Sequence, residues 1–207
     1  MLDLDAVVRS LMRDIGTVLR PMGFRGFGGV WRLVTGEGVV VVQKQGSRGS
    51  AWDDRLFFLD TSVVPKIWWE WKRGAAGSID KAKAADGIRV LEGRVRCVDG
   101  TDLWRVTDGA DVNRLRADLL AAVAKEAGRA VELLKPGRYA AELSALPDKE
   151  VGHWDALVVL LAEHGQTPEL RTACAGLRRA YADRSHAGGY VDRLIEWALN
   201  RPSPGDR

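Results

Sequence analysis

The first twenty residues place apolar side chains at the spacing of an amphipathic helix. A helix buries one face when apolar residues recur every three or four positions. This stripe consists of Leu4, Val7, Val8, Leu11, Met12, Ile15, Val18 and Leu19. Pro21 and Gly23 follow, and both residue types commonly end helices. The pattern predicts a helix over residues 3–20 with one face in the core.

The next part of the chain changes to short runs that are rich in β-branched and aromatic residues, as strands are. Five such runs predict strands at residues 30–34, 38–45, 55–64, 88–95 and 103–106. The first two make an antiparallel hairpin around Gly36 and Gly38, and Pro65 ends the third. Together they predict an antiparallel sheet of about five strands.

The helical period returns near residue 111. A 3.6-residue repeat predicts one long helix from there to Lys135, which Pro136 and Gly137 end. Three shorter helical segments follow, at about 149–164, 168–184 and 188–200. A helix, then a sheet, then helices indicates an α+β fold. We expect an α+β domain at 1–135, with the long helix packed on the sheet, and C-terminal helical hairpins at 136–207 packed on that domain.

Composition narrows the class of protein. The chain has 207 residues, of which 46% are hydrophobic and 29% charged, as in folded globular domains and unlike disordered chains. No run approaches the ~20 apolar residues of a membrane helix, and the N-terminus lacks the pattern of a signal peptide. We therefore expect a cytoplasmic protein with no membrane contact. The net charge of +3 is weak support for a nucleic-acid partner.

Residues that could carry chemistry are scattered. Cys97 and Cys174 are too far apart in sequence for a short metal knuckle, and a cytosolic disulfide is unusual. The three histidines show no metal-ligand spacing, and no serine lies in a Gly-x-Ser-x-Gly elbow. Adjacent Asp53 and Asp54 would point to opposite faces of a strand, which disfavours a shared metal. We predict no cofactor, no metal and no catalytic set.

The glycine-rich residues 23–29 invite comparison with a phosphate-binding loop. Such a loop follows a strand and opens a helix, whose N-terminus faces the phosphate. Here the predicted helix precedes the glycines and the predicted strand follows them. The reversed order favours a tight helix-to-strand turn.

Tryptophan is the unusual residue of this sequence, with eight in 207. Three of them, Trp68, Trp69 and Trp71, lie within four positions, and basic residues flank them at Lys66, Lys72 and Arg73. In a strand, Trp69 and Trp71 would share a face; in a helix, Trp68 and Trp71 would, and Trp69 would leave it. In either case one ring stays near the surface. Exposed aromatic rings beside arginine are typical of protein interfaces. The alternative is that these rings lie flat over the sheet as part of the core.

Several segments of the first half resemble a known family. They are Leu19-Arg20-Pro21-Met22-Gly23-Phe24, Trp31-Arg32, Val42-Gln43-Lys44-Gln45-Gly46-Ser47 and Phe57-Phe58-Leu59-Asp60. In this order they resemble the bacterial family known as domain of unknown function 4304. The resemblance implies no activity, cofactor or catalytic residue. Its bacterial setting is compatible with accessory or immunity-type proteins that bind another protein.

Two functions follow from these observations. The first is a non-catalytic protein-binding module that uses the segment of Lys66, Trp68, Trp69, Trp71, Lys72 and Arg73. The alternative is a nucleic-acid-binding protein that uses a basic face of the sheet, with Arg25, Arg32, Lys44 and Arg48 joined by Lys66, Lys72 and Arg73. If the protein were an enzyme, Asp60, Glu70 and His153 would be the candidate catalytic groups. The sequence does not predict the oligomeric state.

Overall fold

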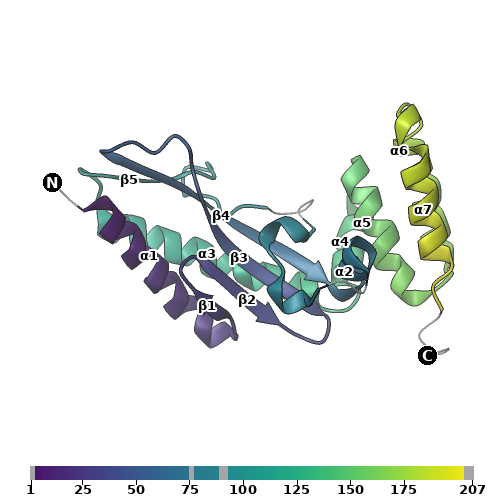
Figure 1. Ribbon diagram of the computed structural model, residues 1–207, viewed down its shortest axis with the longest axis horizontal. Coiled ribbons are helices and arrows are strands. Elements are labelled where there is room, and N and C mark those ends of the chain that lie inside the picture. Colours follow the sequence, from purple (N-terminus) through teal and green to yellow (C-terminus); the bar gives the residue numbers. More distant parts are fainter. Residues whose placement is uncertain (1–2, 75–76, 89–92, 203–207) are drawn as a thin grey trace. The chain divides into compact units, whose positions relative to one another are not determined.

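The computed structural model describes residues 3–74, 77–88 and 93–202 (Figure 1). The chain divides into two compact units. Unit 1 comprises Met1–Val64 and Gly77–Leu134, and unit 2 comprises Pro65–Ala76 and Lys135–Arg207. Residues 65–76 therefore belong with the C-terminal helices, although they lie inside the predicted first domain.

Unit 1 begins with α1, Leu4–Leu19, as its apolar stripe predicts. Asp3 caps the helix, because its carboxylate accepts a hydrogen bond of 2.9 Å from the Ala6 amide. Leu11, Ile15 and Leu19 are fully buried. The 3₁₀ turn Arg20–Met22 follows, and Gly23 ends it in the left-handed conformation at φ 91°.

The sheet of unit 1 has five strands in the order β1-β2-β3-β4-β5. They are β1 Arg25–Phe27, β2 Val30–Val34, β3 Gly38–Gly46, β4 Asp54–Pro65 and β5 Trp104–Thr107. The antiparallel hairpin of β2 and β3 is confirmed, with Trp31 opposite Val42. The prediction of a strand at 88–95 is wrong for the described residues, where Ile88 and Arg94 form isolated bridges; residues 89–92 lie outside the description. The fifth strand is instead β1, in the glycine-rich segment.

The long helix α3, Val112–Leu134, confirms the 3.6-residue repeat, and Asp111 caps it. It contacts both α1 and β3, and Figure 1 shows α1 and α3 side by side. The other face of β2 and β3 is covered by the 3₁₀ turns Ile79–Lys81 and Ala84–Asp86. Arg32 Nε donates to the Ala82 carbonyl at 2.6 Å, and Gln43 accepts from the Ala84 amide at 3.1 Å.

Unit 2 is helical. Its α-helices are α2 Lys66–Arg73, α4 Arg138–Ala145, α5 Val151–Leu161, α6 Pro168–Ala180 and α7 Gly188–Leu199. The apolar α5 is central, because it contacts each of the other four. Short 3₁₀ turns at Ala162–His164 and Ser185–Ala187 separate α5, α6 and α7. None of the helices in the described ranges combines the length and apolarity needed to span a bilayer.

Candidate functional site

The tryptophan-rich segment folds as the helix α2, between Pro65 at its start and Gly74 at its end. Helical geometry therefore decides which ring faces outward. Ile67 and Trp68 are buried, with 3% and 7% exposure. Lys66, Trp69 and Arg73 follow at helical spacing on the opposite side, which we call the outer stripe of α2. Trp69 is half-buried, and both cations are exposed.

The inner face of α2 is held by aromatic packing within unit 2. The Trp71 ring lies 5.2 Å from the Trp197 ring and 6.2 Å from the Tyr190 ring, both at tilted angles. Such geometries add stability beyond burial of the ring area. Trp71 is therefore part of a structural cluster, and Trp69 is the ring that faces outward from α2.

A carboxylate lies beneath this cluster. Asp155 of α5 accepts a hydrogen bond of 3.1 Å from the Tyr181 hydroxyl. Burial raises the pKa of Asp155, and hydrogen bonds from Tyr181 and Tyr190 partly oppose that change. Burial and the neighbouring Asp155 raise the pKa of Tyr181 to about 12 and also raise that of Tyr190. These groups form an internal polar network that holds α5 and α7.

Cations surround the exposed side of α2. The Arg73 guanidinium lies 5.7 Å from the Trp69 ring, and the Lys72 ammonium lies 4.9 Å from the Trp68 ring. Glu70, the one acidic residue of α2, is bound by Arg201 at 2.8 Å. The helix therefore presents an aromatic ring among positive charges, with its own carboxylate already neutralised.

The three residues named as catalytic candidates have structural contacts instead. His153 Nδ1 accepts from the Glu150 amide at 2.8 Å and so caps α5. Glu70 is bound to Arg201, and Asp60 lies 3.5 Å from Arg94. Asp60 belongs to unit 1 and the other two to unit 2. These contacts hold α5, α2 and β4 in place.

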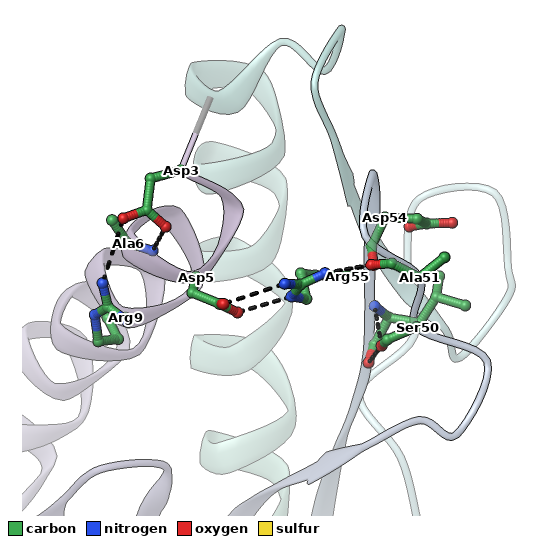
Figure 2. Close-up of polar contacts among 9 residues, drawn as sticks. Asp3, Asp5, Ala6, Arg9, Ser50, Ala51, Asp54 and Arg55 are labelled. Carbon is green, nitrogen blue, oxygen red and sulfur yellow. Dashed lines mark hydrogen bonds and ion pairs between the residues drawn. The ribbon is translucent and has the colours of Figure 1, made fainter. Parts of the chain in front are cut away.

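The described residues contain no arrangement of side chains suited to metal binding or thiol chemistry. No cluster of three or more His, Cys, Asp or Glu residues among them could hold a metal. Asp54 binds Arg105 at 2.8 Å, and Figure 2 shows it pointing away from Asp5. Both cysteines are free thiols, and burial raises the pKa of each.

The basic residues of the sheet lie on different faces. Arg25 and Arg32 are directly opposite each other on β1 and β2, so they share one face. Lys44 shares the opposite face with Trp31, because Trp31 pairs with Val42 and Lys44 lies two residues further on β3. Arg48 is exposed in the loop after β3. The sheet thus does not gather these cations into one basic surface.

Sequence reasoning missed the residues that support α2. They are Asp155, Tyr181, Tyr190, Trp197 and Arg201. One signal was present: Tyr190 and Trp197 are seven residues apart and lie on one face of α7. No comparable signal indicated that α2, some 120 residues earlier, would meet them.

The fold and this site define an α+β protein with a helical region that carries the outer stripe of α2 on its surface. The chain belongs to the family described as "Domain of unknown function (DUF4304)", whose model matches residues 15–143. This match confirms the resemblance noted in the N-terminal segments. Neither the comparison with curated proteins nor that with solved structures gave a match.

Proposed function

We propose that this protein is a non-catalytic protein-binding module of the bacterial cytoplasm, of an accessory or immunity type. Its binding surface is the outer stripe of α2, with Lys72 at its edge. The partner chemistry that fits is an acidic protein segment carrying an apolar side chain for Trp69. Charge complementarity carries this choice, since Arg73 lies over the Trp69 ring, Lys66 and Lys72 are exposed on the same helix, and Glu70 is paired with Arg201.

The main support is that the three clustered tryptophan rings lie in different environments. Trp68 is buried and Trp71 packs on Trp197, so α2 is anchored by two rings. Trp69 is thereby held on a rigid helix at the surface. Binding energy in protein interfaces concentrates in aromatic and arginine residues. A ring that is already held on a rigid helix loses little conformational entropy when it docks.

The test compares Trp69→Ala with Trp52→Ala, which removes a tryptophan that is 79% exposed in unit 1. Proteins that co-purify with wild type and Trp52→Ala but not with Trp69→Ala are then purified, and their affinity is measured by calorimetry. We expect Trp69→Ala to weaken the purified complex by about 2 kcal/mol, or thirtyfold, with little change in melting temperature. Lys72→Gln should weaken it less, and mainly through the association rate.

Two results would contradict the proposal. One is equal affinity of Trp69→Ala and wild type for every purified partner. The other is binding of an oligonucleotide in place of a protein, with an affinity that depends on Trp69 and falls steeply with salt, as phosphate contacts require. That second result would establish the nucleic-acid alternative.

A further inference from the structure

Unit 1 contains a pocket of about 340 Å³ between α1, the β1–β2 hairpin and β3. This volume lies within the usual range of sites for small molecules. Four cationic side chains line the pocket: Arg9 and Arg13 of α1, Arg20 just after it, and Lys44 of β3. No acidic residue is among the lining residues. The pocket therefore has a strongly positive wall.

The nearby carboxylates leave most of this charge uncompensated. Asp5 is bound by both Arg55 Nε, at 2.7 Å, and Arg55 Nη2, at 3.1 Å, as Figure 2 shows. Asp3 lies 3.7 Å from Arg9 in an exposed pair, which contributes little. The Asp5 carboxylate also attracts Arg9 and Lys44 at longer range. Among the described residues, no ion pair joins a carboxylate directly to Arg13, Arg20 or Lys44.

The floor of the pocket adds a neutral donor. Trp31 is 99% buried, yet its indole N–H donates to no acceptor among the described residues. A Cβ atom placed on Gly16 would lie 3.3 Å from Trp31 Nε1 and 3.4 Å from Arg20 Nη2. The two nitrogens therefore border the same space, which exists because residue 16 is glycine. An oxyanion there would meet one neutral and one charged donor.

The rim of the pocket is apolar. Phe27 ends β1 beside the Gly28–Gly29 turn and is 89% exposed, the highest exposure of any large hydrophobic residue described. Met12 and Val8 of α1 line the pocket as well. A ligand that covers this ring beside the cationic cavity would remove apolar area from water and gain contacts with it.

We propose that this pocket binds a small organic oxyanion, in which a carboxylate or phosphate group is carried on a compact aromatic or aliphatic body. The oxyanion lies between Trp31 Nε1 and Arg20, with Arg13 and Lys44 supplying further charge. The apolar body contacts Phe27 and Met12. This site is separate from the proposed function, since α2 belongs to unit 2.

The experiment follows the indole N–H resonance of Trp31 in ¹⁵N-labelled full-length protein. The probes are 3-phenylpropionate, phenyl phosphate, the neutral analogue 3-phenylpropanamide, and inorganic phosphate. Both aromatic anions should shift the resonance with a dissociation constant on the order of 1 mM, as expected for ligands of this size. The tighter of the two identifies the oxyanion. The neutral amide and inorganic phosphate should each bind about tenfold more weakly, because each lacks half of the recognised chemistry.

Variants distinguish binding in the pocket from non-specific attraction of anions to positive charge. Arg20→Gln should weaken the aromatic anions about tenfold, whereas Arg25→Gln, which removes a cation that does not line the pocket, should leave their affinity unchanged. Gly16→Ala should fill the space between the two donors and lower affinity without loss of folding, since alanine favours a helix. Its matched control is Gly128→Ala in α3, where the new atom would meet only Met22 Cε at 4.0 Å.

Several outcomes would overturn the proposal. They are the absence of any Trp31 shift with either aromatic anion, equal affinity for the neutral amide, and equal weakening by Arg25→Gln and Arg20→Gln. A further one is a single-stranded oligonucleotide that shifts Trp31 at concentrations far below those of the small anions. In that case the pocket would be part of a nucleic-acid surface.

Discussion

Two helical glycines lie beneath tryptophan rings, one in each unit, and the two contacts differ. In unit 2, a Cβ atom on Gly176 of α6 would lie 2.4 to 2.6 Å from three ring carbons of Trp154. That ring also has the Lys149 ammonium 5.4 Å from its centre. In unit 1, a Cβ atom on Gly16 of α1 would lie 3.3 Å from Trp31, and the nearest atom is the polar Nε1.

The difference shows two uses of the same residue pair. At Gly176 the glycine brings α5 and α6 close together, and the ring fills the space between them. At Gly16 the glycine leaves room beside an indole N–H that opens into the cationic pocket. Tryptophan thus closes a helix contact in unit 2 and supplies a donor to a cavity in unit 1. The following experiments test this contrast, from the largest expected effect to the smallest.

Deleting residues 3–20 would remove α1 and with it the contact between Gly16 and Trp31. The deletion uncovers the surfaces that meet Leu11, Ile15 and Leu19, each worth roughly 1.5–3 kcal/mol when buried. That sum is comparable to the total stability of a domain, so we expect β2 and β3 to lose their amide protection in hydrogen exchange. Retention of a cooperative melt would show that α1 does not complete the core.

Replacing tryptophans one at a time on α2 would sharpen the contrast between rings that pack within unit 2 and the ring that faces outward. Trp71→Ala should cost about 2–3 kcal/mol, because the ring packs on Trp197 and Tyr190. Trp69→Ala should cost less than about 1 kcal/mol, since its ring faces outward. Urea denaturation of both variants measures the difference. Equal losses would mean that both rings belong to the core.

Substituting the two glycines tests the comparison directly. Gly176→Ala should destabilise the protein by about 1–2 kcal/mol, because overpacking against Trp154 exceeds the gain in helix propensity. Gly16→Ala should leave stability unchanged or raise it by up to about 1 kcal/mol, as Gly128→Ala should. Denaturant midpoints of the three variants are the measurement. A large loss of stability for Gly16→Ala would show that Gly16 packs against Trp31 as tightly as Gly176 packs against Trp154.

The half-buried phenol of Tyr181 in unit 2 gives the smallest effect, because solvent screens it and because the effect appears only at high pH. The pKa of Tyr181 is about 12 in the folded protein, against an ordinary value of 10. Between these pH values the unfolded chain releases this proton while the folded chain keeps it, so stability falls as pH rises. Tyr181→Phe removes this contribution. Wild type should therefore lose stability more steeply than the variant from pH 10 to 12, and parallel curves would contradict the raised pKa of this phenol.

The elements with a strong period were predictable from sequence, and those made by distant partners were not. α1, α3 and the β2–β3 hairpin each carry their own hydrophobic pattern over five residues or more. β1 has three residues, and its pairing with β2 alone makes it a strand. For α2 the sequence left helix and strand open, although Pro65 before it and Gly74 after it are common helix boundaries.

The candidate sites divide in the same way. The clustering of Trp68, Trp69 and Trp71 was visible in sequence, but its meaning depended on α7, which lies far along the chain. Trp31 is buried, yet its N–H opens into a pocket. That pocket joins the flank of α1 to Lys44 on β3, and only the fold brings these residues together.

The placement of α2 in unit 2 has a consequence for synthesis on the ribosome. The helix ends at Arg73, and its central partner α5 begins at Val151, which is 78 residues later (151 − 73). At roughly 5–20 residues per second, this interval lasts about 4–16 s. During that time Trp68 and Trp71 have been synthesised, but the helices that will cover them have not. The nascent chain therefore exposes an aromatic segment flanked by basic residues, and such transiently exposed apolar surface favours aggregation.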